Sequence, residues 1–326
     1  MINKIIFSLS IIFSGILLGY LLQYLYEKKR MSLPVSREKL RKNLQKISFL
    51  FFAPVSFVGA IWIANINTFK AVSMPLMGIT AFLVGALFAY IAALLMELSK
   101  SKTGIYIISG SFSNIGSIGG LVCYAFFGET GYALTPIYNF VLPAVYFAIG
   151  FPVVRYFSNH FTEKESIISR FASALLDPFV LVSLGSIVLG FILNFSEINR
   201  PKIYSNIIAI FVPLGNFLML ISVGLELKLS KIKKYLKECM ILSLIKFILV
   251  PLITGIIAWK IGLGQLDGGL PLKVVIVLSS MPVALIALVP SSIYDLGLNM
   301  VNSCWLFTTI AMVVIIPALY FILNLI

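Results

Sequence analysis

Long apolar segments alternate with short polar segments along the chain. Ten apolar segments, numbered spans 1 to 10 in chain order, cover residues 5–26, 47–66, 71–97, 104–127, 131–154, 171–194, 203–226, 238–259, 274–293 and 299–325. Helices of about 20 apolar residues cross the roughly 30 Å hydrocarbon core of a bilayer. The alternating ten-residue pattern of an outer-membrane barrel is absent from the sequence. The pattern therefore predicts an all-α membrane protein with ten transmembrane helices.

The basic residues predict the orientation of these spans. Of the 25 Lys and Arg residues, 18 lie in the loops after the odd-numbered spans, 6 lie on the opposite side, and Lys246 lies inside span 8. Loops rich in Lys and Arg stay in the cytoplasm. We therefore expect a multi-pass protein of the cell membrane with both termini outside. Span 1 is expected to remain as a helix rather than to act as a signal peptide, because a basic loop follows it and no small-residue cleavage site does.

Composition excludes several classes of function. Hydrophobic residues make up 60% of the chain and charged residues 11%. The net charge of +13 does not predict nucleic-acid binding, because the basic residues flank apolar spans, where they meet lipid headgroups. The three cysteines are scattered, and His160 lies in a polar loop, so no metal site or cofactor is predicted. No HExxH or GxSxG motif occurs, and no enzyme is expected.

Ten spans in this orientation divide into five plus five. Spans 1 and 6 begin on opposite sides of the membrane, so the two halves have opposite topology, as in an inverted repeat. We expect one transporter domain over residues 1–326, with a first repeat at 1–157 and a second at 158–326.

Two spans at matching positions of the halves carry helix-breaking residues. Span 4 contains the sequence SGSFSNIGSIGG, and the break is expected at Gly116–Gly120, which includes Gly119. In span 9, Pro282 lacks a backbone N–H, and Ser279 and Ser280 stand beside it. Interrupted helices at matching positions of inverted repeats are typical of a substrate site near mid-membrane, where the ends of half-helices attract ions. The alternative is a pair of kinked packing helices.

The polar residues near these breaks each have two interpretations. The Asn114 side chain can bind substrate or form a hydrogen bond between packed helices. Ser279 and Ser280 can offer hydroxyls to a carboxylate or bond the carbonyls that Pro282 leaves unpaired. Asn216 in span 7 is a candidate pore or packing residue.

Lys246 and Asp177 are the candidate charge or coupling residues. Lys246 can attract an anion or alternate between paired and free states, can extend toward the lipid headgroups, or can pair permanently with Asp177. Asp177 precedes Pro178, so it can cap the helix that begins there or take part in proton or cation coupling.

Together these residues resemble the auxin efflux carrier family, which includes the plant PIN-type carriers and bacterial relatives. The resemblance rests on Asn114-Ile-Gly116 with Gly119, AFFG at 125–128 with Gly131, LLDP at 175–178, Pro213 with Gly224, Lys246 with Pro251, Met281-Pro282, Tyr294-Asp295, Thr308-Thr309 and Pro317. The chain departs from the family pattern at Leu121, where Pro is frequent, and at Asp177, where Asn is common.

The resemblance implies a fold and a function. It implies a scaffold of spans 1, 2, 6 and 7 and a mobile core of spans 3–5 and 8–10, in which spans 4 and 9 cross and the core moves like an elevator. It also implies transport of a small organic anion, such as a dicarboxylate or an auxin-like acid. A proton or sodium ion is the candidate coupling ion, and a homodimer is a candidate assembly.

Three other hypotheses remain. A sodium-coupled symporter of the bile-acid type would need several oxygen ligands for sodium. An intramembrane enzyme would hydrolyse a substrate, and a sensor would bind a ligand without carrying it across the membrane.

Overall fold

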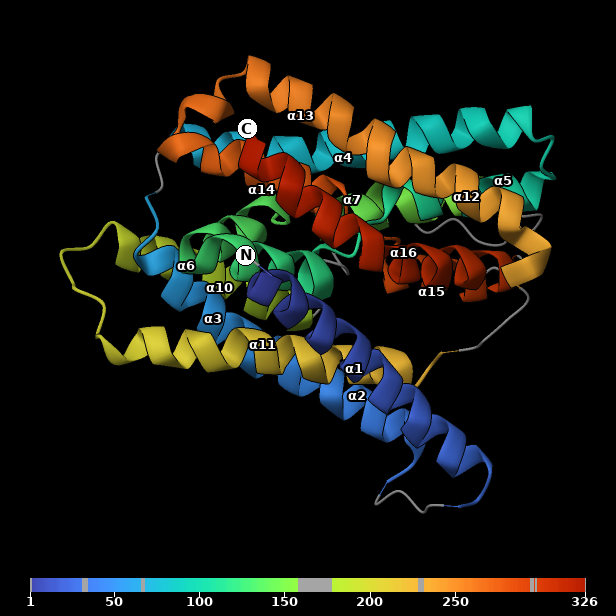
Figure 1. The fold of residues 1–326 in the computed structure, drawn as a ribbon, viewed down its shortest axis with the longest axis horizontal. Coiled ribbons are helices and arrows are strands. Elements are labelled where there is room, and N and C mark those ends of the chain that lie inside the picture. Colours follow the sequence, from blue (N-terminus) through green and yellow to red (C-terminus); the bar gives the residue numbers. More distant parts are fainter. Residues whose placement is uncertain are drawn as a thin grey trace. The chain divides into compact units, whose positions relative to one another are not determined.

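The structure is a computed structural model that describes residues 2–30, 35–65, 68–157, 178–227, 232–293, 296 and 298–325. In this part of the chain, helices are joined by turns and short connections, and the only β-type pairing is one isolated bridge (Figure 1). The chain forms two compact units, each assembled from separate stretches of sequence. Unit 1 comprises Met1–Ile66, Gly116–Pro136 and Pro178–Lys228, and unit 2 comprises Asn67–Ile115, Ile137–Asp177 and Leu229–Ile326.

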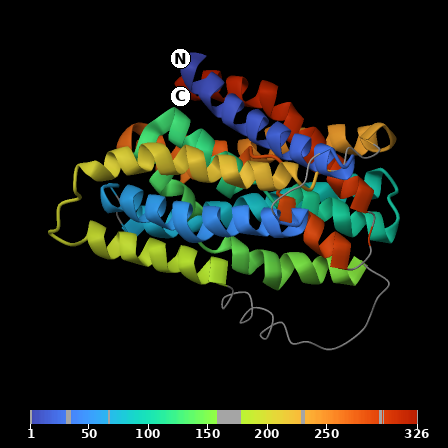
Figure 2. The same cartoon turned by 90° about the horizontal axis from the view of Figure 1, so that it is seen from below.

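Unit 1 is a bundle of long helices. Its helices are α1 (Ile2–Glu27), α2 (Arg37–Ile47), α3 (Ala53–Trp62), α6 (Gly120–Tyr138), α10 (Pro178–Asn194) and α11 (Ile203–Gly224). Helix α11 packs against α1, α2 and α3, and α3 also packs against α10. Figure 2 shows the extended connection between α10 and α11 (yellow) at one end of this bundle. Helix α10 is described from Pro178 onward, and Asp177 lies outside the described residues, so a helix start at Pro178 with Asp177 as its cap stays a prediction.

Two glycines let α1 and α11 approach at backbone distance. A Cβ atom added at Gly19 would lie 2.1 Å from the Ile221 carbonyl oxygen, and one added at Gly224 would lie 2.2 Å from the Ile16 carbonyl oxygen. Small residues allow such contact between membrane helices, where dispersion forces replace the hydrophobic effect. This contact fixes α1 against the rest of unit 1.

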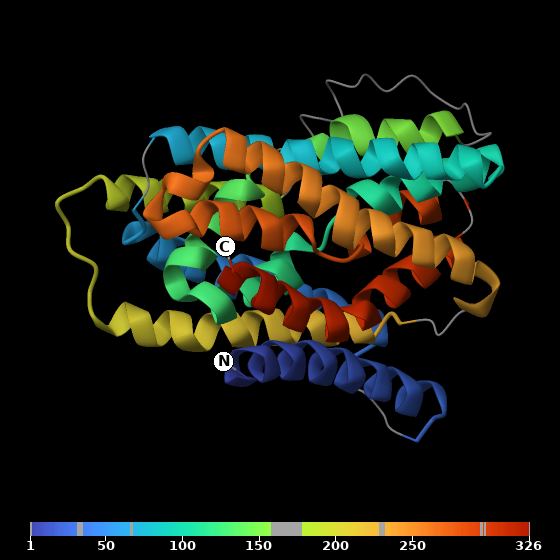
Figure 3. The ribbon, with the colours of Figure 1, turned by 45° about the horizontal axis from the view of Figure 1, so that its top comes forward.

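Unit 2 contains the points at which spans 4 and 9 are interrupted. Its helices are α4 (Thr68–Leu95), α5 (Lys100–Ser111), α7 (Leu142–Val145), α8 (Phe151–Phe157), α12 (Leu236–Leu244), α13 (Val250–Lys260), α14 (Leu270–Ser279), α15 (Leu288–Ile293) and α16 (Leu298–Leu325). Helix α4 packs on α5 and α13, and α13 packs on α14. Figure 3 shows α12 and α13 (orange) following each other as one long helix.

Three helices contain a π-helical turn just before a proline. The turns are Ser48–Phe52, Tyr146–Gly150 and Ile245–Leu249, and Pro54, Pro152 and Pro251 follow them. A proline ring clashes with the carbonyl four residues earlier in a regular helix, and a π turn widens the helix there. The helices therefore pass their prolines without a full break, and Lys246 lies in the third of these turns.

Seven helices of the described residues are long and apolar enough to cross a membrane, and α10 is a shorter apolar helix. The sequence predicts ten spans. The difference has three sources. The apolar stretch Ile115–Phe157 joins parts of spans 4 and 5, the pieces of the interrupted span 9 are too short alone, and only residues 178–194 of span 6 lie in the described part of the chain. The multi-pass helical class is confirmed, whereas the ten-helix count and the inverted repeat stay predictions.

Each of the two units draws on both halves of the sequence, and the repeats at 1–157 and 158–326 stay predictions. The resemblance places all of span 4 in a mobile core. The structure instead divides span 4, with residues up to Ile115 in unit 2 and Gly116–Pro136 in unit 1.

Candidate functional site

Both predicted interruptions are present in unit 2, and their backbones pair. Helix α5 ends at Ser111 and α14 ends at Ser279. Ser113 and Val283 then form an antiparallel bridge. Its hydrogen bonds run from the Asn114 N–H to the Pro282 oxygen, at 2.8 Å, and from the Ala284 N–H to the Phe112 oxygen, at 3.0 Å. This pairing supplies partners for backbone groups that leave the helical ladder, as a buried segment requires.

The first break lies earlier than the sequence predicts. The helix is interrupted at Phe112–Asn114, whereas Ile115–Gly119 forms a π-helical turn that leads directly into α6. The expected break at Gly116–Gly120 is therefore wrong in position by a few residues. Aromatic packing fixes the observed position, because the Phe112 ring stacks on Tyr146 with ring centroids 4.2 Å apart and covers Gly150, where a Cβ would lie 2.5 Å from the ring.

Ser279 and Ser280 are both fully buried, and both hydroxyls donate to the Ile276 carbonyl oxygen, at 3.2 Å and 2.7 Å. Each hydroxyl proton is used in its own helix, so these groups do not offer donors to a carboxylate in this arrangement. Of the two interpretations, bonding to local carbonyls is the one observed, although the acceptor is Ile276 rather than the carbonyl four residues before Pro282.

Lys246 directs its ammonium to the break. Its side chain is completely buried, and Nζ donates to the Gly110 oxygen at 3.3 Å, the Phe112 oxygen at 3.3 Å and the Ser113 Oγ at 2.6 Å. Of the three alternatives for Lys246, extension toward the headgroups is not the arrangement observed. The alternative of a pair with Asp177 concerns a residue outside the described part of the chain.

The close approach of α4 and α5 brings the Gly110 carbonyl into this cluster. A Cβ on Gly85 would lie 2.3 Å from the Gly110 oxygen, and a Cβ on Gly110 would lie 2.5 Å from Ala89 Cβ. Thr308 supports the other strand of the bridge, because the Val283 N–H donates to its Oγ1 at 3.2 Å. Asn114 is also buried and contributes its backbone N–H to the bridge.

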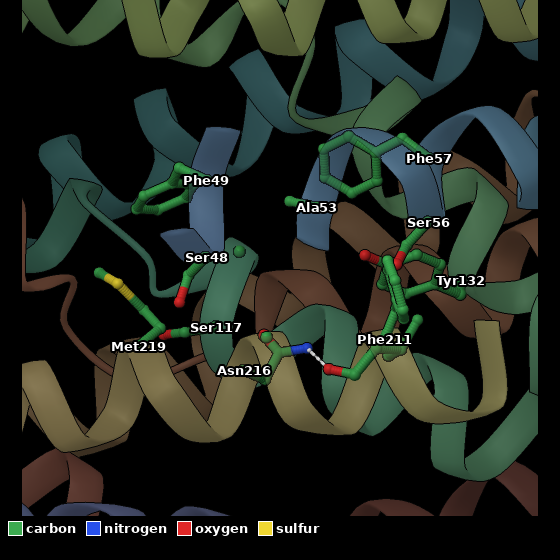
Figure 4. A pocket seen from close by; sticks show the side chains of 13 residues that line it. Ser48, Phe49, Ala53, Ser56, Phe57, Ser117, Tyr132, Phe211, Asn216 and Met219 are labelled. Carbon is green, nitrogen blue, oxygen red and sulfur yellow. Dashed lines mark hydrogen bonds between the residues drawn. The ribbon is translucent and has the colours of Figure 1, made fainter. Parts of the chain in front are cut away.

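Unit 1 contains a small, mostly apolar pocket of its own that includes a few polar side chains and has a volume of about 40 Å³. Its lining comes from the π-helical turn Ser48–Phe52 and α3, from the π-helical turn before α6 and α6 itself, and from α11: Ser48, Phe49, Ala53, Ser56, Phe57, Gly116, Ser117, Tyr132, Phe211, Val212, Gly215, Asn216 and Met219. Figure 4 shows Ser48, Ser117 and Asn216 around the same space. Among the described residues, no charged side chain lines it. Its volume suits a few water molecules and is too small for an organic acid.

Two polar groups of this pocket are informative. The Ser48 hydroxyl is buried and has no hydrogen-bond partner among the described residues, so a water or ligand would satisfy it. The Asn216 amide nitrogen donates to the Val212 oxygen at 2.7 Å (Figure 4). The sequence indicates Asn216 and Gly116 as candidates, but it gives no sign that Ser48 is involved, because a serine in an apolar helix is common.

The predicted site residues thus fall in both units. Asn114, Ser279, Ser280, Pro282 and Lys246 gather at the paired breaks of unit 2. Gly116 and Gly119 belong to unit 1, where Gly116 lines the pocket and Gly119 is buried at the end of the π-helical turn.

Searches for similar proteins add no family to these observations. No protein-family model matches the chain, and no curated protein sequence matches it.

Proposed function

We propose that this protein is a secondary carrier that moves a small organic anion across the cell membrane by alternating access. The observation that carries the proposal is the antiparallel contact of Ser113 with Val283, which joins two interrupted helices in the interior of unit 2. Membrane proteins leave the helical backbone at depth only where the segment is buried in protein or lines a cavity. Such interruptions are the usual substrate sites of secondary transporters.

The charge at the break supports an anion as substrate. Lys246 places an ammonium within hydrogen-bond distance of Ser113, next to the bridge. A buried cation in a membrane protein is costly and typically marks a site for substrate or ion. Dicarboxylates and auxin-like weak acids are the candidate substrates.

The finer architecture is part of the same proposal. It comprises ten spans in an inverted five-plus-five arrangement, termini outside, elevator movement of a core against a scaffold, and a homodimer. The resemblance to the auxin efflux carriers and the distribution of Lys and Arg support these features.

Uptake into proteoliposomes tests the proposal. Radiolabelled dicarboxylates, short monocarboxylates and indole acids would be offered under an imposed pH gradient, an imposed sodium gradient, or neither. The proposal expects saturable uptake of at least one acid class that empty liposomes lack. Uptake that requires sodium would favour the bile-acid type of symporter. Binding of an acid without any flux would favour a sensor, and hydrolysis of the acid would favour an enzyme.

A further inference from the structure

Three oxygen atoms at the end of α5 surround the Lys246 ammonium. They are the carbonyl oxygens of Gly110 and Phe112, each 3.3 Å from Nζ, and the hydroxyl oxygen of Ser113, at 2.6 Å. An ammonium has three N–H donors, so each donor has one acceptor here. The Phe112 oxygen also accepts from the Ala284 N–H, which links the cluster to the second break.

The acceptors are all neutral. Among the described residues, no carboxylate forms an ion pair with Lys246. The carbonyls at a helix C-terminus carry partial negative charge, which favours a cation. In transporters with interrupted helices, unwound carbonyls and half-helix C-termini are the groups that coordinate a coupling cation. The Lys246 ammonium therefore occupies the kind of site that a free cation takes elsewhere.

We propose that Lys246 is a tethered cation. Its ammonium fills a cation site formed by Gly110, Phe112 and Ser113, and so replaces a dissociable coupling ion at this position. The consequence for transport rests on the proposed carrier function. The cation site itself rests only on the geometry of unit 2, so the two can be tested separately.

The test removes the ammonium group by mutation and then supplies a free alkylammonium ion in solution. Lys246→Ala removes Cγ, Cδ, Cε and Nζ, and n-propylammonium has the same four heavy atoms. The purified variant would be melted in detergent with n-propylammonium, with n-propanol, or with neither. We expect the variant to melt below the native protein, and millimolar propylammonium to raise its melting temperature by about 3 °C or more. The neutral alcohol should leave it unchanged.

Matched proteins control for nonspecific amine effects. In the native protein the lysine side chain occupies the space that propylammonium would take, and in Lys246→Met the methionine side chain occupies most of it. Propylammonium should therefore not raise the melting temperature of either protein. Equal effects of alcohol and amine on Lys246→Ala would mean that only a cavity is filled, and would overturn the proposal. The proposal would also be overturned if propylammonium did not raise the melting temperature of Lys246→Ala. Equal melting temperatures of Lys246→Met and the native protein would overturn it as well.

If Lys246→Ala does not fold, cell-free synthesis into nanodiscs with each additive provides the readout. A larger amount of folded protein with propylammonium than with propanol supports the proposal. Equal amounts with the two additives overturn it, and so does the absence of folded protein with both. In proteoliposomes, native uptake should be independent of sodium, while uptake by Lys246→Ala should depend on propylammonium. If the native protein carries no acid, the carrier proposal fails and the melting result still stands.

Discussion

The backbone N–H of Asn114 donates a 2.8 Å hydrogen bond to the carbonyl oxygen of Pro282, and this bond joins two helices that both stop inside unit 2. Proline contributes an acceptor and no donor, so the strand after α14 can pair at Pro282 only through its oxygen. The residue that ends the helical ladder thus also forms the contact with the other break. This connects helix interruption with a defined site rather than with loose packing.

The bond on the other side of the bridge can be removed selectively. Ala284 has φ of −75° and ψ of 146°, which proline adopts without strain, but proline would delete the N–H that bonds the Phe112 oxygen. We expect Ala284→Pro to lower the free energy of unfolding by about 1–3 kcal/mol. It should also reduce uptake. Ala284→Ser keeps the N–H and is the matched control. Equal stability of the two variants, measured by thermal or denaturant unfolding, would show that the bridge is not important.

The pocket of unit 1 can be filled without a clash. A Cβ on Gly116 would meet nothing within 4 Å, and the residue lines the pocket. Gly116→Leu should therefore fold as well as the native protein. If water held in this pocket belongs to the transport route, its displacement should reduce uptake about tenfold, which corresponds to about 1.4 kcal/mol. Gly185→Leu, on α10 and equally uncrowded, should transport normally. Normal uptake by Gly116→Leu would exclude the pocket from the transport route.

The contact of α1 with α11 does not tolerate a side chain. Gly19→Ala would place Cβ 2.1 Å from the Ile221 oxygen, so the helices must separate. We expect a loss of stability of about 1–3 kcal/mol, typical of overpacking. Gly185→Ala should be neutral or stabilising, because alanine favours helices by up to about 1 kcal/mol over glycine. If Gly19→Ala and the native protein had the same melting temperature, the close approach of α1 and α11 would be contradicted.

Arg200 ties three helices of unit 1 together. Its guanidinium donates to the Gly59 oxygen at 2.8 Å, to Glu129 at 2.5 Å and to the Ser205 hydroxyl at 2.7 Å, and its side chain is only 7% exposed. Arg200→Met should cost more than about 1 kcal/mol and at most about 3–5 kcal/mol, because the Glu129 carboxylate, whose side chain is 19% exposed, stays partly buried without its cation.

The exposed pair of Lys42 with Glu38 is the comparison for Arg200. Its side chains are 57% and 68% exposed, so Lys42→Met should cost less than about 1 kcal/mol. Adding Glu129→Gln to Arg200→Met should recover part of the lost stability. Equal melting temperatures of Arg200→Met and Lys42→Met would show that the pair of Arg200 with Glu129 contributes no more to stability than the exposed pair.

The sequence predicts the helical membrane class and the presence of two breaks, because these depend on local chemistry. Apolar length predicts spans, and proline or clustered glycine weakens a helix wherever it stands. The exact position of the first break depends on contacts with residues that are distant in the sequence. Phe112 is held there by Tyr146 and Gly150, residues more than thirty positions away in the sequence.

The partners of Lys246 were also beyond sequence reasoning. The sequence indicates that a cation in span 8 needs a partner, and the residue pattern suggests a carboxylate. The actual acceptors are mostly backbone carbonyls, which every residue carries and no motif encodes. Only the glycine contact between α4 and α5 brings one of them into reach.

Solute counterflow of a radiolabelled organic acid tests the central claim most directly. It would compare the native protein with Asn114→Ala and with Asn324→Ala, which changes an exposed residue of α16 about 24 Å along the helix from Thr308. We expect counterflow by the native protein and by Asn324→Ala, and at least about tenfold weaker counterflow by Asn114→Ala. Equal counterflow by all three proteins would contradict a substrate site at the paired breaks.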